Sequence, residues 1–430
     1  MKKIGFQTLG CKVNIYESNA LKNELLHRGY QIVEPSEECD AFIINTCSVT
    51  NMADAKSRKI IHKMIKLNPN AVFCVMGCYS QTSDDVLNIP EVDVIVGNGN
   101  KLDIIPLLEE KLLDKSIEQK LNRVDILNYH DFEKLEVTSY DHTRAFVKIE
   151  DGCENFCTYC IIPYARGPVR SKNAEDLILE LKRVTASGFL EIVLAGIHTG
   201  KYNDNGLNLT GLIKRILKEV PLIKKLRLSS IEINEIDEEF ISLLGKTSVL
   251  ANHLHLPLQS GSDLILSKME RKYDLNFFIK KIQAIRAVRP DISITTDIIV
   301  GFPYETEAEF LETYSFAKKI GFSKIHVFPY SLRKGTKASL MPQVKELQKK
   351  ERTKRLIDLS NQLELEYAQQ FLHKKMDCII EQETKDGFMV GHTTNYLQVH
   401  IPLNQIYLKK YVMIEVTEIN QGKIYGKIIE

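Results

Sequence analysis

Several features are missing from this sequence of 430 residues, and each absence excludes a class of protein. The N-terminal residues contain no apolar segment of signal-peptide length, and no apolar run approaches the length that spans a membrane. The formal net charge is only +1, so a nucleic-acid-binding surface must be sought in local patches. We therefore expect a cytoplasmic protein whose nine cysteines are free thiols available to metal, without a disulfide framework.

A fourth cysteine is missing from the most informative motif. Cys153, Cys157 and Cys160 have C-x3-C-x2-C spacing in a loop that follows an alternating run at 145–149, and the next cysteine is Cys378. A closed zinc site needs four ligands, and an electron-carrying cluster normally takes four cysteines. Three thiolates on a 4Fe-4S cluster would leave one iron open to an outside ligand. The alternatives are a zinc knuckle completed by a distant histidine, or a disulfide loop.

The first 135 residues predict a parallel α/β sheet covered on both faces, because near-continuous apolar strands alternate with helical segments. Cys11, Cys47 and Cys78 each follow the carboxyl end of a predicted strand. Ligands bind at this edge of open parallel sheets, so these thiols predict a second metal site. The alternative is three unrelated buried thiols.

Residues 143 to about 370 predict a parallel, barrel-like sheet, because six strands alternate with helices. The predicted strands are 145–150, 191–195, 225–229, 253–258, 293–300 and 324–329. Chemistry in such barrels collects at the carboxyl ends of the strands, where Gly196, Ser229, Gln259 and Ser260 lie. Strand-end capping or turn chemistry is the alternative role for Gln259, Ser260 and Asp297.

The remaining segments complete a prediction of three domains. Residues 373–430 contain short alternating strands and predict a small all-β barrel. Residues 114–142 are polar and poorly periodic, which indicates a linker. We interpret His253 and His255 as core histidines, with metal binding as the alternative, and Cys39, Cys74 and Cys378 as small buried hydrophobes. The expected boundaries are 1–135, 140–370 and 373–430.

Local groups of basic residues are candidates for RNA contacts. A lysine face on the helix after Cys47 is either its solvated side or a contact to RNA phosphates. Residues 333–358 hold nine Lys or Arg against three acids, which favours a tRNA backbone contact over a solvated helix. Two arginines after the cysteine loop could bind a cofactor carboxylate, an RNA phosphate or a buried carboxylate. These candidates are Lys56, Lys59, Lys63, Lys66, Arg166, Arg170, Arg333, Lys349 and Arg352.

With Tyr159 before its last cysteine, the C-x3-C-x2-C motif resembles the radical S-adenosylmethionine signature. Thr8-Leu-Gly-Cys11-Lys-Val-Asn14, Asn45-Thr-Cys47-Ser-Val-Thr50 and Gly77-Cys78-Tyr-Ser-Gln81 are similar to the three motifs of the methylthiotransferase N-terminal domain. The resemblance covers essentially the whole chain. The segment from Cys11 to Asn14 is most similar to the branch that acts on N6-threonylcarbamoyladenosine in tRNA.

This resemblance implies a fold and a set of cofactors. It implies a parallel α/β N-terminal domain, a radical SAM partial (β/α)6 barrel and a C-terminal TRAM barrel. Cys153, Cys157 and Cys160 would hold a 4Fe-4S cluster that binds and cleaves S-adenosylmethionine. Cys11, Cys47 and Cys78 would hold a second 4Fe-4S cluster that presents sulfur. The implied cofactor-binding residues are Tyr159, Gly196, Ser229, Gln259, Ser260 and Asp297.

The resemblance also implies an activity. Two molecules of S-adenosylmethionine would be used to place a methylthio group on carbon 2 of N6-threonylcarbamoyladenosine at position 37, in the anticodon stem-loop of tRNA. An external electron donor and a sulfur source would be required. The rivals are the same chemistry on isopentenyladenosine or on a ribosomal-protein aspartate, and a noncatalytic iron–sulfur protein that binds RNA.

Overall fold

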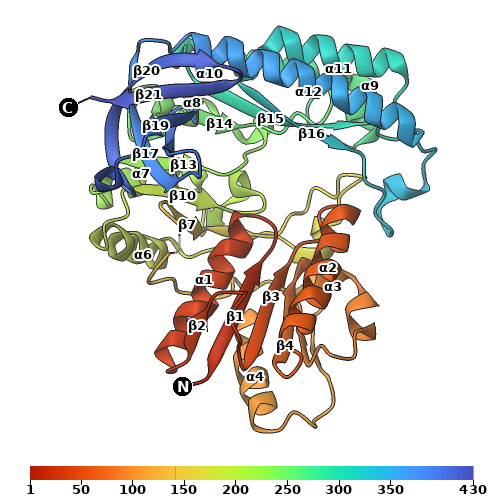
Figure 1. Cartoon of the computed structure of the whole chain (residues 1–430). Coiled ribbons are helices and arrows are strands. Elements are labelled where there is room, and N and C mark those ends of the chain that lie inside the picture. The colour runs from red at the N-terminus through yellow and green to blue at the C-terminus, as the bar shows by residue number, and fades with distance from the viewer. Residues whose placement is uncertain (141, 430) are drawn as a thin grey trace.

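In the computed structural model, which describes residues 1–140 and 142–429, a six-stranded parallel sheet organises the N-terminal domain (Figure 1). Its order, β2-β1-β3-β4-β5-β6, reverses direction between β1 and β3. Alternate residues of β3 enter two separate apolar cores, so both faces of the sheet are covered. The prediction of a covered parallel sheet is therefore confirmed. The strands are β1 (Lys3–Thr8), β2 (Gln31–Val33), β3 (Ala41–Thr46), β4 (Val72–Gly77), β5 (Val94–Val96) and β6 (Lys120–Asn122).

Four α-helices accompany this sheet, and three of them begin close to the ends of strands that carry cysteines (Figure 1). Thr50 caps α2 by accepting a hydrogen bond from the backbone of Ala53 at 3.1 Å, which fixes where that helix begins. The helices are α1 (Lys12–His27), α2 (Asn51–Leu67), α3 (Cys78–Thr82) and α4 (Ile104–Leu113).

The prediction of a linker at 114–142 is wrong in part. β6 pairs with β5 as the edge strand of the sheet, and Leu135 and Val137 are buried against Tyr16. The hydroxyl of Tyr16 donates a hydrogen bond to the carbonyl of Leu135 at 2.8 Å. β6 has only three residues, is partly exposed and is polar at both ends. Its pattern is therefore too short for hydrophobic periodicity to identify a strand.

Six parallel strands form the central domain, as predicted. They make two three-stranded sheets, β7-β10-β13 and β14-β15-β16, joined by parallel bridges between Leu226 and Leu250 and between Ser230 and His255. The result is one open, curved sheet with the main apolar core of the chain. The strands are β7 (Ala145–Lys148), β10 (Glu191–Ala195), β13 (Lys225–Leu228), β14 (His253–His255), β15 (Ser293–Val300) and β16 (Lys324–Pro329).

Helices that follow the strands cover this sheet (Figure 1). No helix within the described residues is long and apolar enough to cross a membrane. The longer helices are α6 (Ala174–Ala186), α7 (Leu209–Glu219), α8 (Glu238–Lys246), α10 (Leu275–Val288), α11 (Glu307–Ile320) and α12 (Glu346–Gln369), and the shorter ones are α5 (Ile162–Arg166) and α9 (Asp263–Lys268).

The C-terminal domain is a closed five-stranded barrel in the order β17-β18-β19-β21-β20, consistent with the TRAM prediction. It is fixed to the central domain, because both Nη atoms of Arg227 donate to the carbonyls of Thr393 and Thr394 at 2.8 and 3.0 Å. The amide of Asn395 also donates to the hydroxyl of Tyr367 in α12 at 3.0 Å. The strands are β17 (Lys375–Glu383), β18 (Phe388–Thr393), β19 (Gln398–Pro402), β20 (Tyr411–Asn420) and β21 (Lys423–Ile428).

Three cations of the basic segment at 333–358 are buried in ion pairs, which corrects the RNA-contact prediction for these residues. Its other lysines, Lys334, Lys337, Lys345, Lys350 and Lys354, are exposed. Arg352 in α12 is 3% exposed and pairs with Glu305 at 2.8 Å. Lys349 is 4% exposed and pairs with Glu346 at 2.8 Å, and the buried Arg333 pairs with Asp54 at the start of α2. A buried guanidinium with a carboxylate partner is not available to an RNA phosphate.

We expect Arg352→Met to lower the free energy of unfolding by roughly 3 kcal/mol, because it leaves Glu305 buried without its partner. Burial raises the pKa of Glu305 to about 7, so the loss should be smaller at pH 5, where the carboxyl takes up a proton, than at pH 8. Urea unfolding at both pH values measures this.

Arg355→Met is the matched control, since Arg355 lies on the same helix and also stacks over Phe310 but is 35% exposed. Its exposed pairs should contribute about 1 kcal/mol or less. Equal losses for the two variants would show that Arg352 does not hold α12 through a buried ion pair.

Candidate active site

The first group of cysteines lies in the loop between β8 (Glu150–Asp151) and α5. Cys153, Cys157 and Cys160 are free thiols, and they lie close enough for charge on one to raise the pKa of another. The loop is tightly shaped: Gly152 has φ +96°, and a Cβ there would lie 1.9 Å from the carbonyl oxygen of Pro168. The backbone amide of Cys153 donates to the carbonyl of Gly167 at 3.0 Å, which closes the loop.

Two side chains from the barrel contact these thiols. Nη1 of Arg271 donates to Sγ of Cys157 at 3.4 Å, and Nδ1 of His198 lies 3.6 Å from Sγ of Cys153. The ring of Tyr159 packs edge-to-face on Phe302, with 6.3 Å between centroids. Arg271 was not identified from the sequence, because it lies more than 100 residues along the chain from the loop that it contacts.

The second group of cysteines lies where the order of the N-terminal sheet reverses. Cys11 follows β1, Cys47 follows β3 and Cys78 begins α3, so the folded sheet brings together the three thiols that the sequence predicts to converge. Gly10 has φ +107°, and a Cβ there would lie 3.1 Å from the Cβ of Cys47. Glycine therefore permits the close approach of these two loops.

Arg166 connects the two groups. It lies at the end of α5, just past the first group, and its Nε donates to Sγ of Cys78 in the second group at 3.4 Å. Its Nη atoms donate to Glu17 at 2.7 Å, Asp151 at 3.0 Å and Asn14 at 2.7 Å. The side chain is completely buried, so an RNA phosphate cannot reach it.

Arg166 belongs to a buried charge network across the domain junction. Glu17 also pairs with Lys101 at 3.1 Å and with Lys148 at 3.0 Å. Asp151 also pairs with Lys148 and with Arg170, whose buried guanidinium is equally unavailable to RNA. Arg166, Lys101 and Lys148 together lower the pKa of Glu17 despite its burial. Both carboxylates are therefore charged.

A cavity of about 600 Å³ opens between the domains. The N-terminal domain contributes Cys11 and Lys12, and the barrel contributes Gly196, Ser229 and Asp297. Three of the six cofactor-binding residues implied by the resemblance therefore meet in one space. Oγ of Ser229 is buried and has no hydrogen-bond partner among the described residues, so it is available to a ligand.

The other predicted cofactor residues have structural contacts. Gln259 takes a left-handed φ of +68° and bridges to Ile298, which shapes the end of its strand. Ser260 is buried, with its Oγ 3.2 Å from that of Thr313. Gly196 leaves room for Glu150, whose Oε2 would lie 2.7 Å from a Cβ at that position.

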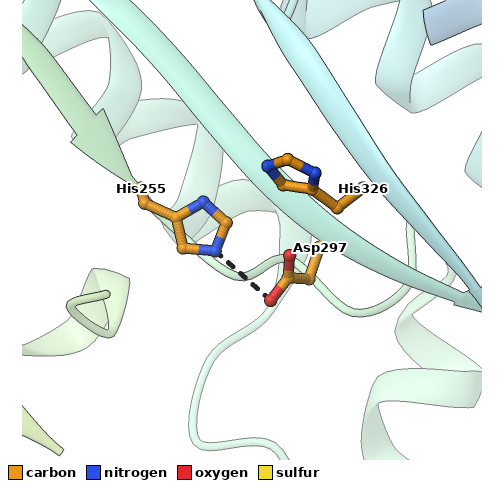
Figure 2. A group of neighbouring side chains, drawn as sticks. All are labelled: His255, Asp297 and His326. Atoms are coloured by element: carbon orange, nitrogen blue, oxygen red, sulfur yellow. Dashed lines mark ion pairs between the residues drawn. The ribbon is translucent and has the colours of Figure 1, made fainter. Parts of the chain in front are cut away.

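His255, Asp297 and His326 form a His–Asp–His group, which Figure 2 shows, and all three residues line the cavity. Nε2 of His255 pairs with Asp297 at 3.2 Å, and the ligand atoms of His255, Asp297 and His326 all lie within 4.8 Å of one another. His326 was not identified from the sequence, although its place in the predicted strand at 324–329 gave a signal. Nδ1 of His255 lies 2.9 Å from Oγ1 of Thr295, so this ring is satisfied without a metal ion.

Both cysteine groups fit a cluster held by three thiolates. Each consists of three free, converging thiols with a cationic side chain beside one sulfur, Arg271 in the first and Arg166 in the second. Within the described residues, the network around Arg166 contains four cations and the carboxylates Glu17, Asp151 and Glu133, which leaves one positive charge in excess. That excess favours an anionic group at the second cysteines.

Two family comparisons match separate parts of the chain. Residues 3–97 match the family described as "Uncharacterized protein family UPF0004", and residues 147–317 match the Radical SAM superfamily. The first range contains Cys11, Cys47 and Cys78, and the second contains Cys153, Cys157 and Cys160. The two matched ranges therefore divide the cysteines as the structure does.

Curated relatives match along the full length. The threonylcarbamoyladenosine tRNA methylthiotransferase MtaB of Bacillus subtilis is 41% identical over 100% of this chain and 98% of the relative. The protein of the same name from Aquifex aeolicus is 38% identical over 89% of this chain and 94% of its own. A tRNA-2-methylthio-N(6)-dimethylallyladenosine synthase of Thermoanaerobacter is 34% identical over 99% and 92%.

Solved structures share the fold. The radical S-adenosylmethionine methyltransferase TsrM of Kitasatospora setae has a TM-score of 0.55 at 12% identity, covering 76% of this chain and 73% of TsrM. The cobalamin-dependent S-adenosylmethionine radical enzyme OxsB has a TM-score of 0.52 at 13% identity, covering 86% of this chain and 56% of OxsB. At these identities the likeness establishes the fold alone.

Alkylation of the metal-free protein should distinguish the cysteines of the two three-thiol groups from the buried cysteines outside them. Burial raises the pKa of Cys47 to about 11 and that of Cys153 to about 12, and the thiolate is the reactive form. Their alkylation rates should therefore keep rising above pH 9.5, whereas a free thiol would level off near its pKa of about 8.5. Iodoacetamide labelling followed by peptide mass spectrometry measures each site.

The buried cysteines outside the motifs provide the control. Cys74 and Cys378 are fully buried with raised pKa values and should resist labelling while the protein is folded. Labelling of Cys74 as fast as that of the exposed Cys11 would contradict this placement of the thiols.

Proposed function

Because the chain belongs to the radical S-adenosylmethionine methylthiotransferase family, we propose that it adds a methylthio group to carbon 2 of N6-threonylcarbamoyladenosine at position 37 of tRNA. It is a radical SAM enzyme that uses 4Fe-4S clusters and S-adenosylmethionine and methylthiolates tRNA. The observation that carries the proposal is the pair of three-thiol groups, joined by Arg166, at one domain junction.

Each thiol group has its own role. Cys153, Cys157 and Cys160 hold the cluster that binds S-adenosylmethionine, and the cysteines of the second group hold the cluster that carries sulfur. When bound, these groups supply the radical chemistry and the sulfur, using two molecules of S-adenosylmethionine, an external electron donor and a sulfur source. The protein positions them, because no side-chain base could remove the unactivated hydrogen at carbon 2 of an adenine.

The cavity residues orient the cofactor and the base. Ser229 has a free hydroxyl, and Asp297 contributes a carboxylate to the same cavity. Gly196 keeps space beside Glu150, and Gln259 and Ser260 fix the turn at the end of the fourth barrel strand. Tyr159 supports the cysteine loop through its contact with Phe302. The enzyme acts in the cytoplasm, where its tRNA substrate is found.

The threonylcarbamoyl branch is favoured over its relatives. The first four relatives carry that name at 35–41% identity, whereas the dimethylallyl enzymes that follow are 30–34% identical. The residues Lys12, Val13 and Asn14 after Cys11 match the same branch.

The substrate proposal is tested with anticodon stem-loops that carry either threonylcarbamoyladenosine or dimethylallyladenosine. The reconstituted wild-type enzyme should form the 2-methylthio nucleoside only from the first. A Cys11/Cys47/Cys78→Ala variant should still release 5′-deoxyadenosine but form no methylthio product, because it lacks only the sulfur-carrying site. Nucleoside mass spectrometry measures both. Methylthiolation of the dimethylallyl stem-loop alone would overturn the substrate assignment.

The lysine face of α2 is an exposed candidate for an RNA contact. Lys56, Lys59, Lys63 and Lys66 are all exposed, while Ile61 and Met64 on the opposite face are buried. Replacing the four lysines by methionine should weaken tRNA binding. It should also reduce the slope of log K against log salt by about one for each phosphate that a lysine no longer neutralises. Binding measured across a salt series tests this.

A variant with the same change in charge is the control. Lys182, Lys280, Lys318 and Lys319 are exposed and dispersed over the central domain. Replacing these four should change the salt dependence less than replacing the α2 lysines. Identical slopes for both variants would exclude a specific contact at α2.

A further inference from the structure

One end of the barrel interior is cationic, which is unusual because parallel barrels are generally filled by apolar side chains. Arg144 directly precedes β7, Arg227 lies in β13, and Lys12 enters from α1 of the N-terminal domain. All three line the cavity that also contains Cys11, Ser229 and Asp297. We call Lys12, Arg144 and Arg227 the cationic end of the cavity.

The two arginines of the cationic end have carboxylate partners, whereas the lysine has none. Glu191 is fully buried and accepts a hydrogen bond from Nε of Arg144 at 2.7 Å, and it also pairs with Arg227. Glu381 is a second partner of Arg144. Across the described chain, Lys12 makes no hydrogen bond or ion pair with a protein group. The cavity therefore faces one ammonium group that lacks a counter-ion.

The C-terminal barrel fixes this end of the cavity. Tyr396 has a left-handed φ of +67° and places its ring 5.6 Å from the guanidinium of Arg144 and 5.2 Å from that of Arg227. The same ring stacks on His253, with 4.7 Å between centroids. The arginines are therefore held in place before any ligand enters, and all three domains contribute to this end.

We propose that the cationic end binds the carboxylate of the threonylcarbamoyl group on the target adenine, with Lys12 as its counter-ion. This inference rests on the proposed function and assigns a specificity role that the cysteines do not supply. A neutral dimethylallyl group would displace water from the ammonium of Lys12 without supplying an anion, which is unfavourable. Lys12 therefore selects the acidic nucleoside and rejects the apolar one.

The position of the cationic end fits the shape of the substrate. Arg144 directly precedes β7, while Cys153 lies beyond the carboxyl end of that strand, so Arg144 and the first cysteine group are at opposite ends of the strand. In adenine, carbon 2 and the N6 group lie on either side of N1. A base that directs carbon 2 toward the first cysteine group directs its N6 substituent away from that group, along the cavity that Arg144 and Lys12 line.

A carboxylate in this cavity could also come from the methionine part of S-adenosylmethionine. The test therefore compares an anticodon stem-loop carrying the threonylcarbamoyl acid with one in which that carboxylate is a carboxamide, and it also measures the dependence on S-adenosylmethionine. Wild-type enzyme should modify the acid with a kcat/KM at least about ten-fold above that for the carboxamide, the effect of one charge-assisted hydrogen bond.

Lys12→Met should remove this preference. Its kcat/KM should fall about ten-fold or more on the acid and stay nearly unchanged on the carboxamide. Lys12→Arg should restore part of the preference, because it restores the charge. Lys218→Met, at an exposed lysine of α7, is the control and should leave both substrates unaffected. Iron content and the S-adenosylmethionine concentration needed for 5′-deoxyadenosine release should be the same in all variants.

Three results would overturn this inference while leaving the proposed function intact. The first is equal kcat/KM of the wild-type enzyme on the acid and the carboxamide stem-loops. This result can be observed without any variant. Another is an equal loss on both stem-loops in Lys12→Met. The third is that Lys12→Met needs a higher concentration of S-adenosylmethionine for 5′-deoxyadenosine release, which would show that the lysine binds the cofactor. Failure of the wild-type enzyme to modify the threonylcarbamoyl stem-loop at all would instead contradict the proposed function.

Discussion

The structure depends on the buried interaction of Arg166 with Glu17, Asp151 and Cys78. Burying an arginine is costly unless its hydrogen bonds are satisfied, and here each nitrogen of the guanidinium has an acceptor. The acceptors come from both domains, so the full set of interactions forms only when the N-terminal sheet and the barrel are correctly docked. One side chain thereby fixes the position of each cysteine group relative to the other.

This arrangement explains why the catalytic parts occupy separate domains. The N-terminal sheet gathers three thiols at the point where its strand order reverses, and the barrel gathers three more after its first strand. Each domain uses the edge that its fold offers to a ligand. The proposed reaction requires both edges to face one base, and the buried charges at the junction hold the two edges in place.

Much of the fold could be predicted from the sequence, because strand patterns and cysteine spacing are local signals. All six barrel strands and the positions of Cys11, Cys47 and Cys78 at one sheet edge follow from such signals. The partners of Arg352 could not be predicted, because Glu305 lies far along the chain and the local run of positive charge suggests an exposed surface. Arg166 was open to three interpretations, and only the folded chain shows which acids surround it.

The central claim is that two three-thiol sites hold separate clusters in one chain. Iron and acid-labile sulfide, measured anaerobically in the wild-type protein and in the Cys11/Cys47/Cys78→Ala variant, test it most directly. We predict the content of two 4Fe-4S clusters for each wild-type chain and of one cluster for the variant, whose remaining cluster still binds S-adenosylmethionine. Equal iron in both proteins would contradict the account, because the second group of thiols would then hold no cluster.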